Sequence, residues 1–219
     1  MQFSTLAPLI EHTLLHPVAG AREIEVLCSQ ARHYQFHGVC VQPVWVRLAA
    51  EYLAGSDVKV VSVVGFPHGA NVPITKAQEA ALAVAHGASE IDLVANLAWI
   101  ASRFWEEVKA EVALVRAAAP KAVLKVILET GYFEPDKVSQ AAEMAIAGGA
   151  DFLKTSTGFG PRGATVDDVR LLSQAAAGRA RIKAAGGIRN SQEALGMVRA
   201  GASRIGTSRG PALVGGESS

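Results

Sequence analysis

The feature that most constrains the fold is a unit that recurs along the chain: a short apolar run, a loop with glycine or proline, and a longer helical pattern. Runs rich in Val, Ile and Leu are typical of strands covered on both faces, as in a parallel sheet. Strands that alternate with helices in this way predict an α/β fold, specifically a (β/α)8 TIM barrel. The predicted strands are Leu9–Glu11, Val39–Val41, Lys59–Val64, Glu90–Val94, Ala122–Leu128, Asp151–Lys154, Arg181–Ala184 and Arg204–Ile205.

The segments between these runs have apolar residues at helical spacing. Two such faces are Trp105, Val108, Val112 and Val115, and Val138, Ala141, Ala142 and Ala145. Thr165 with Asp168, and Asn190 with Glu193, have the spacing of helix N-terminal caps. A doubly wound open sheet is the structural alternative, but it requires a glycine-rich phosphate loop after an early strand. The glycine loops here come late in the chain, which favours the barrel.

Composition limits the possible partners. The 219 residues include 21 basic and 20 acidic side chains, which leaves no basic surface of the kind that binds nucleic acid or a membrane. Apolar runs stay well short of the ~18 residues needed to cross a bilayer, and Met1–Pro8 lacks the pattern of a signal peptide. We therefore expect a cytoplasmic protein with one domain over 1–219, a loose tail from about 214, and a small molecule as its partner.

The polar side chains at the predicted strand ends are the candidates for chemistry. In a barrel the carboxyl ends of all strands meet at one face, where active sites lie. Polar residues at those ends are Glu11, His12, Thr13, Cys40, Asp92, Asn96, Glu129, Lys154, Thr155, Ser156, Thr157 and Lys183. His12 and His68 are possible residues of the pocket mouth, but a hydrogen-bonded histidine in a strand or a loop is the favoured interpretation for both. Cys28 and Cys40 do not form a metal or disulfide pattern, so both are expected to be buried core thiols, and Cys40 is a possible pocket residue because of its strand.

Two lysines end neighbouring predicted strands. Lys154 precedes Thr-Ser-Thr-Gly, and Lys183 precedes Ala-Ala-Gly-Gly. Adjacent strands lie ~4.8 Å apart, so the two amines are expected to be close and to lower the pKa of at least one of them. An unprotonated amine attacks a carbonyl carbon to form a Schiff base. The structural alternative is that Lys154 extends to solvent or pairs with Asp151 or Asp92.

Asp92 and Lys125 are further charged residues within strands. Alternation places Asp92 on the same face as Glu90 and Val94, toward the barrel interior, where a carboxylate requires a partner such as a lysine. Asp92 either orients the lysines or moves protons as a general acid–base group. Lys125 also competes for the Schiff-base role. Because it lies four residues before Glu129, we expect it deeper in the barrel, paired with Asp92 or Glu129.

The last two loops are rich in glycine. Gly186-Gly187-Ile188-Arg189 follows the seventh predicted strand and Gly206-Thr207-Ser208-Arg209-Gly210 follows the eighth. Barrels bind phosphate in these loops through backbone N–H groups. Ordinary turns are the alternative for one such loop, but two loops in these places favour phosphate binding, with Arg189 or Arg209 adding positive charge.

Several of these blocks together resemble the deoxyribose-phosphate aldolase family, in order from about residue 9 to about residue 213. The blocks are EHTLL at 11–15, GFPHG at 65–69, EIDLV at 90–94, LKVILET at 124–130, FLKTSTGF at 152–159 and IKAAGGI at 182–188. The resemblance implies a class I aldolase in which Lys154 forms the Schiff base, Lys183 perturbs its pKa and Asp92 relays protons. Substrate and phosphate contacts are then expected at Thr13, Thr157, Gly158, Gly186, Gly187, Arg189, Gly206 and Ser208.

The implied reaction is reversible cleavage of 2-deoxy-D-ribose 5-phosphate to D-glyceraldehyde 3-phosphate and acetaldehyde. The resemblance implies no metal and no organic cofactor, and it implies a homo-oligomer, a dimer or a tetramer.

Two positions depart from the family pattern. Position 11 is Glu where the family usually has Asp, so its hydrogen bonds are expected to be rearranged. The chain also ends in Glu217-Ser218-Ser219 without the tyrosine that many relatives use in proton transfer. The rivals are a catalytically silent sugar-phosphate-binding barrel and another phosphate-binding barrel enzyme, such as an isomerase or a transaldolase.

Overall fold

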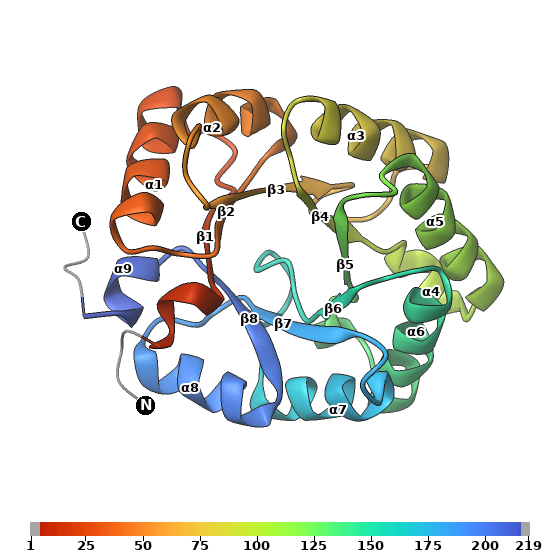
Figure 1. The fold of residues 1–219 in the computed structure, drawn as a ribbon. Coiled ribbons are helices and arrows are strands. Elements are labelled where there is room, and N and C mark those ends of the chain that lie inside the picture. The colour runs from red at the N-terminus through yellow and green to blue at the C-terminus, as the bar shows by residue number, and fades with distance from the viewer. Residues whose placement is uncertain (1–4, 216–219) are drawn as a thin grey trace.

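The computed structural model describes residues 5–215 and contains a closed barrel of eight parallel strands. Each strand pairs with the next along the chain, and β8 returns to pair with β1 (Figure 1). The strands are β1 (Ile10–Leu14), β2 (Gly38–Val41), β3 (Lys59–Val64), β4 (Glu90–Val94), β5 (Val123–Ile127), β6 (Phe152–Lys154), β7 (Arg181–Ala185) and β8 (Ala202–Thr207). The predicted TIM barrel is therefore confirmed, and each predicted run lies within or overlaps one strand.

Helices surround the barrel on its outside (Figure 1). They are α1 (Ala21–His33), α2 (Val46–Tyr52), α3 (Pro73–Ala85), α4 (Leu97–Ser102), α5 (Trp105–Ala118), α6 (Pro135–Ala147), α7 (Val166–Ala176), α8 (Ser191–Ala200) and α9 (Gly210–Leu213). The predicted apolar faces of α5 and α6 are confirmed, because Val108, Val112 and Val115 are buried, as are Val138, Ala141, Ala142 and Ala145. Among residues 5–215, no helix is both long and apolar enough to cross a membrane.

Both predicted helix caps are present. The Thr165 hydroxyl accepts a hydrogen bond from the Asp168 N–H at 3.0 Å, and the Asp168 carboxylate accepts from the Thr165 N–H at 2.9 Å. This reciprocal pair begins α7, which follows the long loop after β6. The Asn190 side chain accepts from the Glu193 N–H at 2.9 Å and begins α8. Each cap therefore fixes the residue at which the loop ends and the helix begins.

The strand register brings charged side chains into the barrel interior. Asp92 pairs with Lys125 across β4 and β5, and Lys154 pairs with Lys183 across β6 and β7. All four side chains are buried, so they have lost nearly all contact with water and must satisfy one another. Of the predicted loose tail, residues 216–219 lie outside the described part of the chain.

Candidate active site

The three residues expected to carry the chemistry meet at one carboxylate. The Lys154 Nζ donates to Asp92 Oδ2 at 2.7 Å, and the Lys183 Nζ donates to the same oxygen at 2.6 Å. Lys125 donates to the other oxygen, Asp92 Oδ1, at 3.0 Å. The sequence alternative in which Lys154 pairs with Asp151 is wrong, because Asp151 pairs with Arg116 on the outside. A single buried aspartate therefore binds lysines from three neighbouring strands.

Lys154 is the lysine of this cluster that opens onto a pocket. The pocket has a volume of about 470 Å³ and lies at the carboxyl ends of the strands, where Lys154 forms part of its wall. Asp92, Lys125 and Lys183 are completely buried behind it. The loop between β6 and α7 curls toward the middle of the barrel opening (Figure 1). A small molecule in the pocket therefore reaches the Lys154 amine before any other group of the cluster.

Burial and neighbouring charges have opposite effects on the pKa values of Lys183 and Asp92. Burial alone lowers the pKa of Lys183, but the carboxylates of Asp92 and Glu11 outweigh it and raise the pKa above its usual value. Burial alone raises the pKa of Asp92, but the charges of Lys125, Lys154 and Lys183 lower it well below its usual value. At neutral pH Lys183 is therefore an ammonium ion and Asp92 a carboxylate. The expected lowering of a lysine pKa does not occur at Lys183.

Lys125 belongs to a deeper layer, as expected from its position in the strand. Its Nζ lies 2.5 Å from Glu90 Oε2 and 3.4 Å from Glu11 Oε1, in addition to its contact with Asp92. Burial lowers the pKa of Lys125, but the surrounding carboxylates outweigh it and raise the pKa. Of the two partners proposed from the sequence, Asp92 is therefore confirmed and Glu129 is wrong. Its depth and its ion pairs separate Lys125 from the Schiff-base role.

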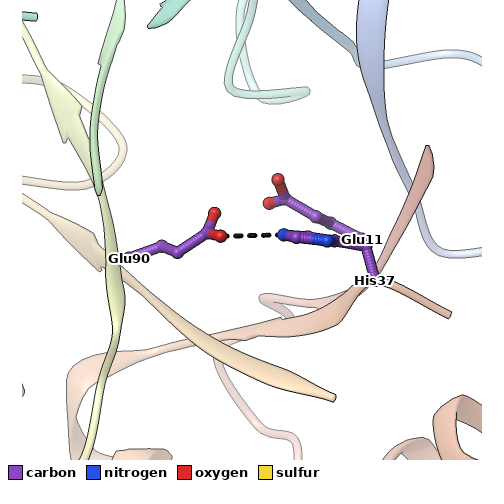
Figure 2. A group of neighbouring side chains, drawn as sticks. All are labelled: Glu11, His37 and Glu90. Atoms are coloured by element: carbon purple, nitrogen blue, oxygen red, sulfur yellow. Dashed lines mark hydrogen bonds and ion pairs between the residues drawn. The ribbon is translucent and has the colours of Figure 1, made fainter. Parts of the chain in front are cut away.

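Glu11, His37 and Glu90 lie close together, and Figure 2 shows the Glu90 carboxylate pointing toward the His37 ring. The His37 Nε2 lies 2.7 Å from Glu90 Oε1, and the Glu11 carboxylate lies beside this pair. Three such side chains resemble a metal site. However, the Lys125 ammonium already contacts both carboxylates, so a cation would have to displace it. His37 precedes β2 in a loop, and no pattern in the sequence singles it out.

The Glu11 carboxylate explains the departure at position 11. Its Oε2 accepts a hydrogen bond from Lys183, and its Oε1 lies 3.9 Å from the Arg204 Nε. The side chain thus extends from Lys183 to Lys125 deeper in the barrel. The hydrogen bonds expected to be rearranged at position 11 are therefore those of a buried carboxylate that contacts both Lys183 and Lys125.

The pocket wall contains every residue that was expected to contact substrate. These are Thr13, Thr157, Gly158, Gly186, Gly187, Arg189, Gly206 and Ser208. Gly186 and Gly187 have φ values of +89° and +77°, a backbone conformation that favours glycine. This conformation turns the β7–α8 loop around the end of β7 and exposes backbone at the pocket. Arg209, which was also considered for phosphate charge, lines the same pocket.

Three other expected residues lie elsewhere. Cys40 is completely buried beneath the pocket, with its Sγ 3.9 Å from Asp92 Oδ2, and burial raises the pKa of its thiol to about 11. His12 points away from the pocket toward Gln30, whose Oε1 lies 2.8 Å from its Nε2. His68 is exposed in the loop after β3 and lies outside the pocket wall. The suggestion that the two histidines line the mouth is therefore wrong.

Comparisons with known proteins agree with this geometry. The model of the DeoC/LacD family aldolases matches residues 8–214. A deoxyribose-phosphate aldolase from Thermus thermophilus is 53% identical over 212 residues, which cover 97% of this chain and 96% of that protein. One from Deinococcus radiodurans is 50% identical over 212 residues, with the same coverage of both chains.

A solved structure extends the likeness to three dimensions. It is described as a tetrameric deoxyribose phosphate aldolase from Aeropyrum pernix, and it has a TM-score of 0.90 at 33% identity. The match covers 98% of this chain and 91% of that one. With a family match over nearly the whole sequence and a lysine in the wall of its pocket, the chain belongs to the DeoC/LacD family of aldolases.

Proposed function

We propose that the protein cleaves 2-deoxy-D-ribose 5-phosphate reversibly to D-glyceraldehyde 3-phosphate and acetaldehyde, through a Schiff base on Lys154. The observation that carries the proposal is that Lys154 faces a pocket while it shares the Asp92 carboxylate with Lys183. The chain's relatives at about half identity are named deoxyribose-phosphate aldolases, which supports the same substrate.

The reaction begins at the aldehyde carbon, C1, of the open-chain sugar. The unprotonated Nζ of Lys154 adds to C1, and loss of water gives a protonated imine. The C3 hydroxyl then gives its proton to Asp92 through a water, and the C2–C3 bond breaks. The electron pair of that bond moves toward the imine nitrogen and leaves a two-carbon enamine on Lys154. The three-carbon aldehyde departs, the enamine is protonated at C2, and water hydrolyses the resulting imine to release acetaldehyde.

The buried charges behind Lys154 have separate roles in this scheme. Asp92 is a carboxylate at neutral pH, accepts the proton that the Lys154 amine loses in carbinolamine formation, and returns a proton to the hydroxyl that leaves as water in dehydration. Lys183 remains an ammonium ion that donates to the same Asp92 oxygen at 2.6 Å, and its positive charge helps to keep Asp92 in the carboxylate form beside Lys154. Both groups are fixed by strand backbone, and little reorganisation is needed during the reaction.

The phosphate of the sugar is assigned to the part of the pocket that the β7–α8 and β8–α9 loops line. Gly186 and Gly187 expose backbone there and Gly206 lines the same wall, while Ser208 supplies a hydroxyl and Arg189 a positive charge. Thr13, Thr157 and Gly158 contact the carbon chain between the phosphate and Lys154. This assignment gives each of the eight residues expected to contact substrate a part of one substrate molecule.

Turnover of the named substrate tests the proposal against its rivals. Purified protein is incubated with 2-deoxy-D-ribose 5-phosphate, and acetaldehyde release is measured with a coupled alcohol dehydrogenase and NADH. Wild-type protein is expected to release acetaldehyde, and a Lys154→Ala variant is expected to lose at least 1,000-fold in kcat/KM, on the order of 4 kcal/mol in the transition state. Tight binding without release would favour the silent binding protein. A three-carbon fragment on Lys154 would favour a transaldolase.

We also infer a homo-oligomer, either a dimer or a tetramer, and a single domain in the cytoplasm. Exposed apolar side chains on α3 and before it support a subunit contact: Val72, Ile74 and Leu82. The barrel closes with β8 against β1, which supports one domain. Free Cys28 and Cys40 suit a reducing compartment. Light scattering after gel filtration tests the oligomer, since a mass of one chain would contradict it.

A further inference from the structure

Glu129 is a buried acid that the catalytic scheme does not use. It follows β5, directly before the short 3₁₀ helix Thr130–Tyr132, and only 1% of its surface is exposed. Its backbone has φ +49°, in the left-handed region that residues with a side chain adopt at a cost of roughly 1 kcal/mol or more. The sequence pattern places Glu129 at a strand end but predicts no contact between it and the substrate.

The Glu129 carboxylate is bound to one residue of the pocket wall. Its Oε2 accepts a hydrogen bond from the Thr157 N–H at 3.1 Å and a second, short one from the Thr157 hydroxyl. Within residues 5–215 its Oε1 has no hydrogen-bond partner. Gly160 lies against this oxygen, since a Cβ there would be 2.7 Å from it. The β6–α7 loop therefore packs around the carboxylate and holds it against Thr157.

These contacts determine which hydrogen-bonding role Thr157 offers to the pocket. A threonine hydroxyl has one proton to donate and two lone pairs that accept. The proton of Thr157 is donated to Glu129, and one lone pair accepts from the Phe159 N–H at 3.0 Å. One lone pair remains, and Thr157 lines the pocket. Thr157 therefore acts toward a ligand as an acceptor and requires a donor group there.

We propose that Glu129 is a positioning residue: it fixes the Thr157 hydroxyl so that its free lone pair accepts a hydrogen bond from a hydroxyl group of the substrate. This inference rests on the proposed function. In the direction of carbon–carbon bond formation, the hydroxyl belongs to the acceptor aldehyde, at the carbon next to its carbonyl. An acceptor without that hydroxyl leaves the Thr157 lone pair unpaired in a buried site, and this penalty lowers its reactivity.

The selectivity between two acceptors measures this role. With acetaldehyde as donor, kcat/KM is determined for D-glyceraldehyde 3-phosphate and for 3-oxopropyl phosphate, which has the same length but lacks the hydroxyl. Wild-type protein is expected to favour the hydroxylated acceptor at least tenfold. Glu129→Met and Thr157→Val are expected to reduce the ratio to about threefold or less, and the double variant is expected to match the single ones because both act through one hydrogen bond.

Conservative variants separate the acceptor role from a purely structural one. Thr157→Ser keeps the hydroxyl, and Glu129→Gln keeps an amide oxygen that accepts the same two hydrogen bonds, so both are expected to retain the wild-type ratio. Glu111→Gln is the matched control, because Glu111 is equally buried but binds Lys76 and the Asn96 N–H outside the pocket. The ratio should be unchanged in that variant, whatever happens to its stability.

Borohydride trapping of acetaldehyde on Lys154 keeps this inference distinct from the proposed function. Acetaldehyde has no hydroxyl, so trapping is expected in wild-type protein and in each folded variant. Absence of the adduct in wild-type protein would contradict the proposed function itself.

If the adduct forms but Thr157→Val and Glu129→Met lower kcat/KM equally for both acceptors, Glu129 only shapes the loop and the inference is wrong. Loss of selectivity in Glu129→Gln would also overturn it. If Glu129→Met fails to fold, the comparison of Thr157→Val with Thr157→Ser still tests whether the Thr157 hydroxyl recognises the substrate hydroxyl.

Discussion

At the scale of single residues, the interior of this barrel depends on charge pairs rather than on apolar packing alone. Glu11, Glu90 and Asp92 lie among Lys125, Lys154 and Lys183, and all six side chains are buried. A buried ion whose partner is removed costs ~3–5 kcal/mol, because the remaining charge has lost its hydration. Stability and chemistry are therefore linked at the same positions, and substitutions there require both measurements.

Substitution of Glu90 tests how much a buried charge contributes to the free energy of unfolding, because Glu90 does not line the pocket. Burial raises its pKa, but its hydrogen bonds and ion pairs with His37 and Lys125 outweigh burial and lower the pKa to about 2. The folded pKa lies below the unfolded one, so the stabilisation is present above pH ~4.5 and disappears as pH falls toward 2. We expect Glu90→Gln to lower the free energy of unfolding by roughly 3 kcal/mol at pH 7.

Urea denaturation of the wild-type and Glu90→Gln proteins at pH 7 and at pH 3 measures this effect. The difference between the two proteins should shrink at pH 3, where most of the stabilisation from the Glu90 charge has been lost. Glu51→Gln is the control, because Glu51 is exposed on α2 and should change stability by less than ~0.5 kcal/mol. A difference that stays constant with pH would show that the charge of Glu90 does not stabilise the fold.

At the scale of elements, two loops meet without side chains between them. A Cβ on Gly163 would lie 2.2 Å from the Gly186 carbonyl oxygen, so the β6–α7 loop and the β7–α8 loop touch through their backbones. The Ala164 N–H also donates to that oxygen at 3.0 Å. We expect Gly163→Ala to separate the loops and raise KM for the phosphorylated substrate at least tenfold. Imine formation with acetaldehyde, which has no phosphate, should persist.

Gly178→Ala is the matched control for the Gly163 variant. Gly178 has φ +80°, but a Cβ added there would have no atom within 4 Å, so its substitution costs only backbone strain, on the order of 1 kcal/mol. Its KM should equal that of the wild-type protein. An unchanged KM in Gly163→Ala, measured by acetaldehyde release, would mean that the contact between the loops does not shape the phosphate site.

The start of α7 gives a second test at this scale. Thr165→Ala removes the hydroxyl that accepts from the Asp168 N–H, and caps of this type contribute ~1 kcal/mol. Asp168 also binds Arg162 through both carboxylate oxygens, so the helix start is held twice. We expect Thr165→Ala to lose about 1 kcal/mol in urea denaturation and Thr165→Ser to lose much less. Equal losses in both variants would contradict a capping role.

At the scale of the whole molecule, much of the fold followed from the sequence because each strand is a short apolar run with a polar end. The barrel places those ends together, so Asp92, Lys154 and Lys183 could be grouped from the sequence alone. His37 could not, because it contacts Glu90 from a loop whose position depends on the closed sheet. The role of Glu129 was hidden for a similar reason, since its partner Thr157 is 28 residues away.

The orientation of side chains set the second limit on prediction from sequence. His12 lies at a strand end like Glu11 and Thr13, yet alternation turns it outward onto α1. Cys40 points inward but stops beneath the pocket wall. Position at a strand end therefore predicted which residues lie near the barrel mouth. Which of them face a ligand depends on whether the side chain points into or out of the barrel, and on how deep in the barrel it lies.

The most direct test of the account is mass spectrometry of the protein after incubation with acetaldehyde and borohydride, with peptide mapping and a Lys154→Ala control. Reduction of an imine leaves a stable ethyl group on the lysine that formed it. We predict this group on Lys154, the lysine of the buried cluster that opens onto the pocket, and its absence from that cluster in the control. An ethyl group on Lys125 or Lys183 instead, or no ethyl group in wild-type protein, would contradict the assignment of Lys154 as the Schiff-base residue.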